Sequence, residues 1–296
     1  MKKCLILCCS LLLLLLSACG GVSASSNKNT TTSEYTSIQN IGSDTMVNLA
    51  LAWAEQYQKD TPEVRVSVTG GGSGTGLAAL ANNTVDIANA SRKIKQEELD
   101  LAEQQNYSPA EFVVARDAIG VIVNLNNPIS ELTLEQIARI YKGEINNWSE
   151  LGGEDRPVVR LSRETNSGTH VYFLETVIRL GNSKDKSIFS ADTLLLPSSE
   201  GIIAEVSDNP NAIGYDGLGY ITSAVKVVAV ARKAGDAYVL PSVETVNDNT
   251  YPVSRDLYMY TRNAPQGAVK TYLDWILSDK AQQIVQDLGF VPLLKK

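Results

Sequence analysis

From residue 38 onward, short apolar stretches alternate with longer segments of mixed polar and apolar residues. Residues 64–69 alternate apolar and polar positions with a period of two, which is typical of a β-strand with one buried face. Residues 45–59 have helical composition and contain neither glycine nor proline, which favours an α-helix. Strands that alternate with helices along a chain predict an α/β fold.

The same reasoning places further elements along the chain. We predict strands at residues 38–41, 85–88, 111–124, 158–162, 212–215, 225–230 and 257–261, and helices at residues 77–81, 96–105, 133–140, 170–180 and 267–288. Thr133 and Gln136 have the spacing of a capping box, and Gly181 and Gly289 are positioned to end their helices. No repeat of ~20–50 residues is visible, which argues against a solenoid or a propeller.

Two of these stretches are long enough to pass from one part of the fold to another. The run at 111–124 could carry the chain out of a first lobe, and residues 251–261 could carry it back. We therefore expect an α/β fold of two lobes with an interlobe cleft. Residues 38–115 and 252–296 would form lobe I, and residues 116–251 would form lobe II. A cleft between two lobes is a common place for a ligand site.

The N-terminal segment has the features of a targeting signal. Two lysines precede an apolar run over residues 4–16, which is shorter than the ~20 residues that a membrane-spanning helix needs. Residues 16–19, Leu-Ser-Ala-Cys, resemble a bacterial lipobox, in which the cysteine is acylated and the chain is cut before it. We expect residues 1–18 to be a signal peptide, and Cys19 to carry lipid at the start of a flexible tether over residues 19–37. The alternative is an ordinary signal peptide that ends near a cysteine.

Composition and charge exclude several kinds of function. Lys and Arg total 26 against 33 Asp and Glu, a net charge of −7, and this acidic balance argues against nucleic-acid binding. The chain has a single histidine, His170, and its four cysteines all lie within the first 19 residues. Residues 20–296 therefore cannot supply a zinc cluster of Cys and His, a disulfide or a cysteine nucleophile. We expect no metal and no cofactor.

Three loops rich in Gly, Ser and Thr, at residues 42–46, 70–76 and 163–169, each lie between a predicted strand and a predicted helix. The first amides of a helix lack intrahelical partners and carry partial positive charge, so a small anion is a natural guest there. Any one loop can instead be a plain helix cap, but three in one chain favour a shared anion site. The candidate residues in these loops are Ser43, Asp44, Thr45, Ser73, Ser167, Gly168 and Thr169.

Arg163 is the candidate cation within the three loops. Its planar guanidinium suits a tetrahedral oxyanion, and Ser-Gly-Thr follows at residues 167–169, about one helical turn along the chain. The alternative is a surface arginine paired with Glu164 or another carboxylate. We favour the anion-binding interpretation because the arginine heads a loop of the same kind as the other two.

The glycine loop at residues 70–76 does not match the motifs that glycine-rich loops often carry. Its glycines fail the G-x-G-x-x-G register, no lysine follows Gly76 as a P-loop requires, and Ser73 lacks the second glycine of G-x-S-x-G. Ser91 follows the strand predicted at 85–88 and could add a hydroxyl to the site. Its neighbour Arg92 could add charge or simply face water.

These features together resemble the phosphate-binding protein family, the substrate-binding lipoproteins of phosphate-specific ABC transporters. Residues 163–169 are similar to the family's Arg-x-x-x-Ser-Gly-Thr anion loop, residues 85–92 to its strand that ends in a ligand-contacting residue, and residues 212–220 to its Ile-Gly-Tyr signature. The resemblance covers nearly all of residues 38–296. It implies a type II periplasmic-binding-protein fold with two hinge crossings, and dehydrated inorganic phosphate held between the lobes without catalysis. Carried over by position, the implied ligand-binding residues are Ser43, Asp44, Thr45, Ser73, Ser91, Arg163, Ser167, Gly168 and Thr169.

The chain departs from the family's pattern at two acidic positions. Many members carry Asp where this chain has Ser91-Arg92, and many carry an acidic residue where it has Thr165. A fixed acceptor for the proton of phosphate can discriminate against a guest without that proton by ~10⁴–10⁵-fold. Asp44 is the natural substitute for the missing acid, and its alternative role is a plain helix cap.

The resemblance implies a protein anchored by lipid on the extracytoplasmic face of the bacterial cytoplasmic membrane. There it would bind inorganic phosphate as a monomer and deliver it to the permease subunits of an ABC importer. One alternative keeps the fold and exchanges the guest for sulfate or molybdate. Another is a secreted phosphohydrolase or phosphotransferase that uses Ser167 and His170 as nucleophile and base. For His170 we favour a packed or surface imidazole.

Overall fold

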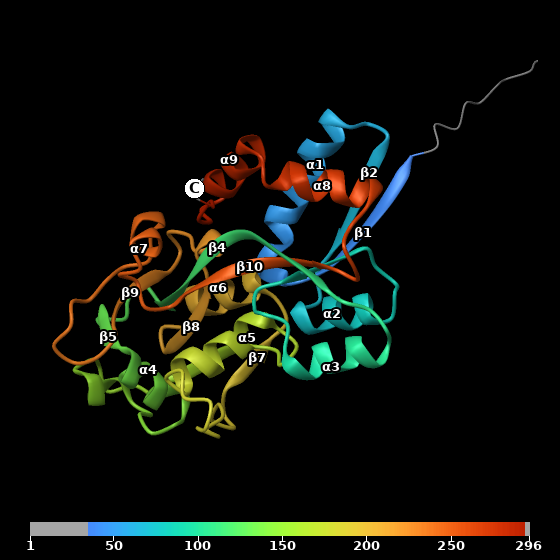
Figure 1. The fold of residues 1–296 in the computed structure, drawn as a ribbon. Helices are drawn as coiled ribbons and strands as arrows, with labels where there is room; N and C mark the ends of the chain where they lie inside the picture. The colour runs from blue at the N-terminus through green and yellow to red at the C-terminus, as the bar shows by residue number, and fades with distance from the viewer. Residues whose placement is uncertain (1–34, 294–296) are drawn as a thin grey trace, which may run out of the picture. The chain divides into compact units, whose positions relative to one another are not determined.

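Strands and helices alternate along residues 35–293, the part of the chain that the computed structural model describes (Figure 1). The strands are β1 Thr36–Gly42, β2 Val64–Thr69, β3 Ile87–Ala90, β4 Ala110–Val123, β5 Glu131–Thr133, β6 Val159–Arg163, β7 Leu194–Leu196, β8 Ala212–Gly217, β9 Lys226–Ala231 and β10 Ser254–Thr261. The helices are α1 Val47–Asp60, α2 Ser73–Ala81, α3 Gln96–Gln104, α4 Leu134–Tyr141, α5 Gly168–Phe173, α6 Ser199–Asp208, α7 Val243–Asn247, α8 Gly267–Ile276 and α9 Asp279–Asp287. The signal peptide, Cys19 and most of the predicted tether lie outside the described residues. Within residues 35–293, no helix is long and apolar enough to span a membrane.

One mixed sheet connects the whole of the described chain. Its strand order is β2-β1-β3-β10-β4-β8-β6-β7, and β9 pairs with both β4 and β5. β1 is parallel to β2 and β3, and β6 is parallel to β7 and β8. Because parallel strands end at the same edge of a sheet, the loops that follow β1, β2 and β3 are brought together there.

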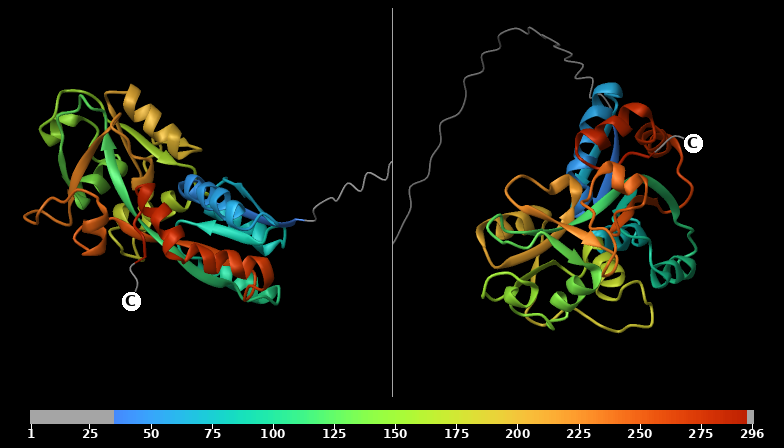
Figure 2. Two further views of the ribbon diagram at one scale, coloured as in Figure 1. Left: turned by 90° about the horizontal axis from the view of Figure 1, so that it is seen from above. Right: turned by 90° about the vertical axis from the view of Figure 1, so that its left-hand side faces the viewer.

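β4 runs through both halves of this sheet, and β10 pairs with its first part; we call these two the crossing strands (Figure 2). β4 pairs with β10 from Ala110 to Ala118 and then with β8 from Ile119 to Val123. The buried apolar residues change cluster along β4: Ala115 packs in one large core and Ala118 in the other. The result is a two-lobe α/β fold, whose lobe limits at 115/116 and 251/252 stay a prediction.

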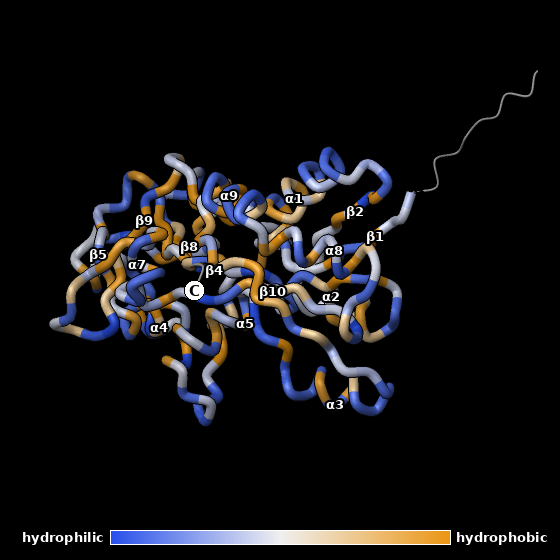
Figure 3. The backbone as a smooth tube through the Cα atoms, turned by 45° about the horizontal axis from the view of Figure 1, so that its top comes forward, coloured by the Kyte–Doolittle hydropathy of each residue, from blue (hydrophilic) through white to orange (hydrophobic). Residues whose placement is uncertain are grey.

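Each lobe has its own aromatic core. In lobe I, Trp53 of α1 is fully buried and its Nε1 donates to the Ala281 carbonyl at 2.9 Å. In lobe II, Tyr215 of β8 stacks on Phe173 of α5 with ring centres 3.6 Å apart. Buried aromatics contribute large apolar areas, and Trp and Tyr need a hydrogen-bond partner as well. Figure 3 shows β9 in hydrophobic colours, in keeping with its run of valine and alanine.

Most of the predicted elements form, but the single helix predicted over 267–288 is wrong. The structure divides it into α8 and α9, because Ser278 leaves the helical conformation and its hydroxyl caps the amide of Ala281 at 3.4 Å. α2 begins at Ser73, earlier than the predicted residue 77. The helix predicted at 170–180 begins at Gly168 and changes to a π-helix over Leu174–Ile178.

Replacing Ser278 with Ala should destabilise the fold by about 1 kcal/mol, the usual value of an N-cap side chain. The hydroxyl is the side-chain group that satisfies the first turn of α9. Urea unfolding followed by circular dichroism measures the change. Ser223→Ala, at an exposed serine in the loop before β9, is the matched control and should leave the midpoint unchanged. Equal midpoints for the two variants would contradict the capping role.

Candidate functional site

The three predicted loops meet at a group of buried hydroxyls, which we call the hydroxyl cluster: Ser43, Thr45, Ser73, Ser91 and Thr169. Ser43 Oγ donates to Ser91 Oγ at 2.9 Å, and Ser73 Oγ lies 3.3 Å from the same atom. Thr45 Oγ1 and Thr169 Oγ1 are 2.8 Å apart, although they are 124 residues apart in sequence. All five side chains lie in residues that are at most 2% exposed.

Gly168, at the start of α5, lies directly against this cluster. A Cβ atom at this position would be 2.3 Å from Ser73 Oγ and 2.6 Å from Ser91 Oγ, which leaves no room for a side chain. Ser167 precedes it as the N-cap, and its hydroxyl accepts from the amides of Thr169 at 3.2 Å and His170 at 3.5 Å. The sequence Ser-Gly therefore ends the loop and brings the helix backbone into contact with the hydroxyls of lobe I.

The second and third loops are also bonded to each other across the cleft. The amide of Gly74 donates to the Asn166 carbonyl at 3.0 Å, and Asn166 Nδ2 donates to the Gly71 carbonyl at 2.8 Å. The described structure is therefore a closed form, in which α2 of lobe I faces α5 of lobe II.

Arg163, the predicted cation, is buried at the end of β6 with 1% of its surface exposed. Its guanidinium donates to Asp44 Oδ2 at 2.9 Å, to Ser199 Oγ at 2.9 Å and to two carbonyls of the 196–197 backbone. These bonds use four of the five N–H donors of an arginine, and the fifth, on Nη1, has no hydrogen-bond partner among the described residues. Arg163 is thus paired with a carboxylate, as in the alternative interpretation, but the carboxylate is Asp44 and the arginine is buried instead of lying at the surface.

Asp44 thus has a role that sequence reasoning did not assign. One carboxylate oxygen pairs with Arg163, and the other accepts from the amide of Gly71 at 2.8 Å. The side chain joins the first loop to the other two. Acceptance of a proton from a bound anion by Asp44 stays a prediction.

A second carboxylate lies behind Arg163. Ser199 Oγ accepts from Arg163 and donates to Asp216 Oδ1 at 2.9 Å. Among the described residues, Asp216 Oδ2 has no hydrogen-bond partner. Burial raises the pKa of the Asp216 carboxyl to about 6, against the opposing charge of Arg163.

Two further charged residues at the site, Arg255 and Asp117, were missed by sequence reasoning. They form a buried ion pair, with Arg255 Nη2 3.0 Å from Asp117 Oδ2, and the same Nη2 lies 3.0 Å from Thr169 Oγ1. The one available signal was that charged residues interrupt both apolar crossing stretches: Glu111, Arg116 and Asp117 in 111–124, and Arg255 and Asp256 in 251–261. Buried charges need partners, but this pattern does not tell which of these charges are buried or which two of them pair.

The remaining candidates have structural roles. Arg92 is buried and makes two hydrogen bonds to Glu98, at 2.7 and 2.8 Å. His170 stacks on Phe189, and its Nδ1 lies 2.8 Å from the Arg163 carbonyl. Burial lowers the pKa of His170, which favours the neutral imidazole. Within residues 35–293, no hydrogen bond joins this ring to the Ser167 hydroxyl.

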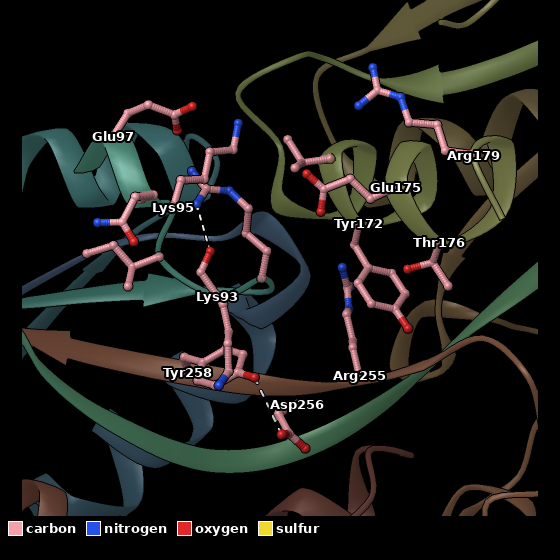
Figure 4. A pocket seen from close by; sticks show the side chains of 14 residues that line it. Lys93, Lys95, Glu97, Tyr172, Glu175, Thr176, Arg179, Arg255, Asp256 and Tyr258 are labelled. Carbon is pink, nitrogen blue, oxygen red and sulfur yellow. Dashed lines mark hydrogen bonds between the residues drawn. The ribbon is translucent and has the colours of Figure 1, made fainter. Parts of the chain in front are cut away.

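A cavity of about 790 Å³ lies beside the cluster, between α3 and α5. Lys93, Lys95 and Glu97 line one side of it, and Tyr172 and Arg179 line the other (Figure 4). Arg255 lines this cavity and also contacts Thr169 of the hydroxyl cluster, so its guanidinium lies between the two. In the part of the chain that the structure describes, no group of three or more His, Cys, Asp or Glu side chains is arranged to hold a metal ion.

Comparison with known proteins assigns this chain to a family. Residues 27–280 match the PBP superfamily domain. The phosphate-binding protein PstS of Pseudomonas aeruginosa is 35% identical over 277 residues, which cover 88% of this chain and 84% of that protein. The chain belongs to the PBP superfamily and, within it, to the PstS family.

Solved structures agree with the assignment to the PstS family. A protein from Clostridium perfringens, described as a phosphate ABC transporter substrate-binding protein with bound phosphate, is 31% identical with a TM-score of 0.79. The match covers 88% of this chain and 100% of that one. An ABC-type phosphate transport receptor from Vibrio cholerae is 28% identical with a TM-score of 0.69, over 86% of this chain and 100% of that one.

In this PstS-family protein, the stability conferred by Asp216 should depend on pH. Its folded pKa of about 6 lies above the ordinary value of 3.8, so the folded state holds the proton more tightly. The stabilisation is complete below pH 3.8 and is lost as the pH rises toward and through 6. Two pKa units correspond to roughly 3 kcal/mol. Asp216→Asn should therefore gain stability relative to the native protein between pH 4 and pH 8.

Urea unfolding at several pH values measures this difference. Asp208→Asn, at an exposed carboxylate of α6, is the control for the general effect of removing a charge. A difference between the native protein and Asp216→Asn that is constant from pH 4 to pH 8 would show that Asp216 titrates normally.

Proposed function

We propose that the chain binds inorganic phosphate outside the cytoplasmic membrane and delivers it to the permease of an ABC importer. The observation that carries this proposal is the meeting of three helix-start loops at one buried hydroxyl cluster beside Arg163. The Pseudomonas aeruginosa relative is named a phosphate-binding protein, and the Clostridium perfringens structure contains bound phosphate. Both support phosphate as the guest of this cluster.

The site offers hydrogen-bond donors rather than net charge. Arg163 is paired with Asp44 and Arg255 with Asp117, so the two ion pairs together are neutral. The amides of Gly74, Thr169 and His170 already donate within the protein. The binding groups in this proposal are therefore the other amides at the starts of α2 and α5, the hydroxyls of the cluster and the remaining Arg163 donor. An anion held by such fixed dipoles needs no counter-ion when water is excluded. In this proposal the contacts are those predicted from sequence, from Ser43 in the first loop to Thr169 in the third.

The same geometry gives no support to catalysis. A serine nucleophile needs a general base within hydrogen-bond reach, and the His170 ring instead contacts the Arg163 carbonyl and the Ser162 hydroxyl. The Ser167 hydroxyl is occupied as the cap of α5. Binding and release without chemical change is the function that these contacts support.

The proposal includes the membrane anchor predicted from sequence. Acylation of Cys19 would hold the protein on the extracytoplasmic face of the bacterial membrane, close to the permease that receives the phosphate. Residues 19–37 would act as the tether, and the protein would work as a monomer. A single lipid chain gives only reversible attachment, so stable anchoring in this proposal requires a second chain or another membrane contact.

Selectivity for phosphate over sulfate depends on acceptors for the proton that phosphate keeps at neutral pH. Each carboxylate oxygen of Asp44 already accepts one hydrogen bond, from Arg163 or from Gly71, so Asp44 is not dedicated to the proton of the guest. The hydroxyls of Ser43, Ser73 and Ser91 can accept this proton, but they can also rotate and donate to a fully ionised guest. We therefore propose a preference for phosphate that is smaller than a dedicated carboxylate would give.

Calorimetric titration of the purified protein tests the function. We expect one phosphate bound per chain, at least tenfold weaker binding of sulfate, and intermediate competition by arsenate, which shares the charge and the proton of phosphate.

Arg163→Ala should weaken phosphate binding at least a hundredfold, because the loops lose their shared cation. Arg232→Ala, at an exposed arginine after β9, is the matched control and should bind like the native protein.

Each outcome of this titration decides one part of the proposal. Equal heats for phosphate and sulfate would make the protein a general oxyanion binder. The absence of binding by any of the anions would refute the function. An Arg163→Ala variant that is folded by circular dichroism and binds normally would remove Arg163 from the site.

Gly168→Ala should weaken phosphate binding at least tenfold while leaving the fold intact. The added methyl group would meet the hydroxyl oxygens of Ser73 and Ser91 and hold the two lobes apart. Gly201→Ala, in α6, is the control, because its Cβ would lie 3.3 Å or more from its neighbours. Unchanged affinity in Gly168→Ala would mean that the bound form does not need this close approach.

A further inference from the structure

The pair of Arg255 and Asp117 lies on the two strands that join the lobes. Arg255 on β10 is directly opposite Asp117 on β4 in the antiparallel ladder. Its Nε and Nη2 donate to Asp117 Oδ2 at 3.3 and 3.0 Å, and neither side chain is more than 2% exposed. Because the two residues face each other across paired strands, this ion pair does not depend on contact between the lobes.

Beyond Asp117, the Arg255 guanidinium contacts groups from both lobes. On the lobe I side, Nη1 donates to the Ser91 carbonyl at 2.9 Å and Nη2 lies 3.4 Å from Thr45 Oγ1. On the lobe II side, Nη2 lies 3.0 Å from Thr169 Oγ1. The guanidinium carbon is 5.6 Å from the centre of the Tyr172 ring, beside which it lies in Figure 4. One side chain therefore touches both walls of the site.

Arg255 also determines which atoms of the cluster can donate to a guest. An arginine has donors only, so Thr45 and Thr169 both turn oxygen lone pairs toward Nη2. The two hydroxyls share one hydrogen bond of 2.8 Å, which uses one of their two hydrogens. The second hydrogen points to neither the arginine nor the other hydroxyl, so it is available to an anion.

We propose that Arg255 is a positioning residue for anion binding, which stabilises the closed form by bridging Thr45 and Thr169 while Asp117 holds it on the crossing strands. The inference rests on the proposed phosphate function. When the lobes part, the bonds to Thr45 and Thr169 cannot both persist, whereas the pair with Asp117 remains. The apparent dissociation constant of a ligand scales inversely with the populated fraction of the binding-competent form. Loss of the bridge therefore weakens binding without removing a direct contact.

Arg255→Lys tests the bridge, because lysine keeps the charge beside Asp117 but lacks the planar fork that reaches both threonines. We expect at least tenfold weaker phosphate binding by calorimetry. Small-angle scattering should show that saturating phosphate gives the variant and the native protein the same radius of gyration. The variant should need at least ten times more phosphate to reach that radius. The secondary structure by circular dichroism should be unchanged.

The crossing strands supply a matched control one residue away. Arg116 of β4 and Asp256 of β10 are also opposite each other, with Arg116 Nε 3.6 Å from Asp256 Oδ1, but this pair is partly exposed and does not contact the cluster. Arg116→Lys should bind phosphate with native affinity. A lower unfolding temperature in Arg255→Lys together with unchanged affinity would show a purely structural role and would overturn the inference.

Different measurements test the role of Arg255 and the proposed phosphate function. Absence of phosphate binding by the native protein refutes the function, whereas native affinity in Arg255→Lys refutes only the bridge. If Arg255→Lys does not fold, the double variant Asp117→Asn with Arg255→Gln replaces the ion pair by two neutral amides. A folded double variant with native phosphate affinity would overturn the inference, and affinity reduced at least tenfold would support it.

Discussion

The site depends on one constraint, which is that hydroxyl groups buried between two lobes must find hydrogen-bond partners. An unsatisfied buried donor or acceptor costs ~1–3 kcal/mol. Here the hydroxyls satisfy one another: Thr45 with Thr169 across the cleft, and Ser43 and Ser73 with Ser91 within lobe I. The parallel strands β1, β2 and β3 bring the first two loops to one edge, and the crossing strands place the third loop opposite them.

The charges around the cluster follow the same rule. Arg163 and Arg255 each have an aspartate partner, and each partner comes from a different segment of the chain. Arg163 connects lobe II to the first loop through Asp44, whereas Arg255 connects the two crossing strands through Asp117. In a protein with a net charge of −7, such pairs keep positive charge at the site without leaving it uncompensated.

Much of the fold and part of the site could be predicted from the sequence, because both depend on local pattern. Period-two strands, the Thr133 capping box and the Ser167-Gly168-Thr169 helix start are short-range signals, and the structure contains all of them. The break between α8 and α9 was missed, since Ser278 and Asp279 are compatible with a helix interior and become a cap only when α9 packs on α1. Arg255 and Asp117 were missed for a similar reason. They lie 138 residues apart, and no local pattern predicts that two charges will meet in a ladder of β-strands.

The continuous sheet through both lobes has a consequence for release of the cargo. β4 and β10 are hydrogen-bonded along Ala110–Ala118 and Ser254–Thr261. We expect separation of the lobes to bend this ladder instead of breaking it. A hinge made of paired strands resists sliding of one lobe past the other and permits rotation about the strands. The starts of α2 and α5 therefore return to the same relative position at each closure. Tight binding and repeated release are then compatible, because the β-ladder that aligns the two lobes stays intact during both.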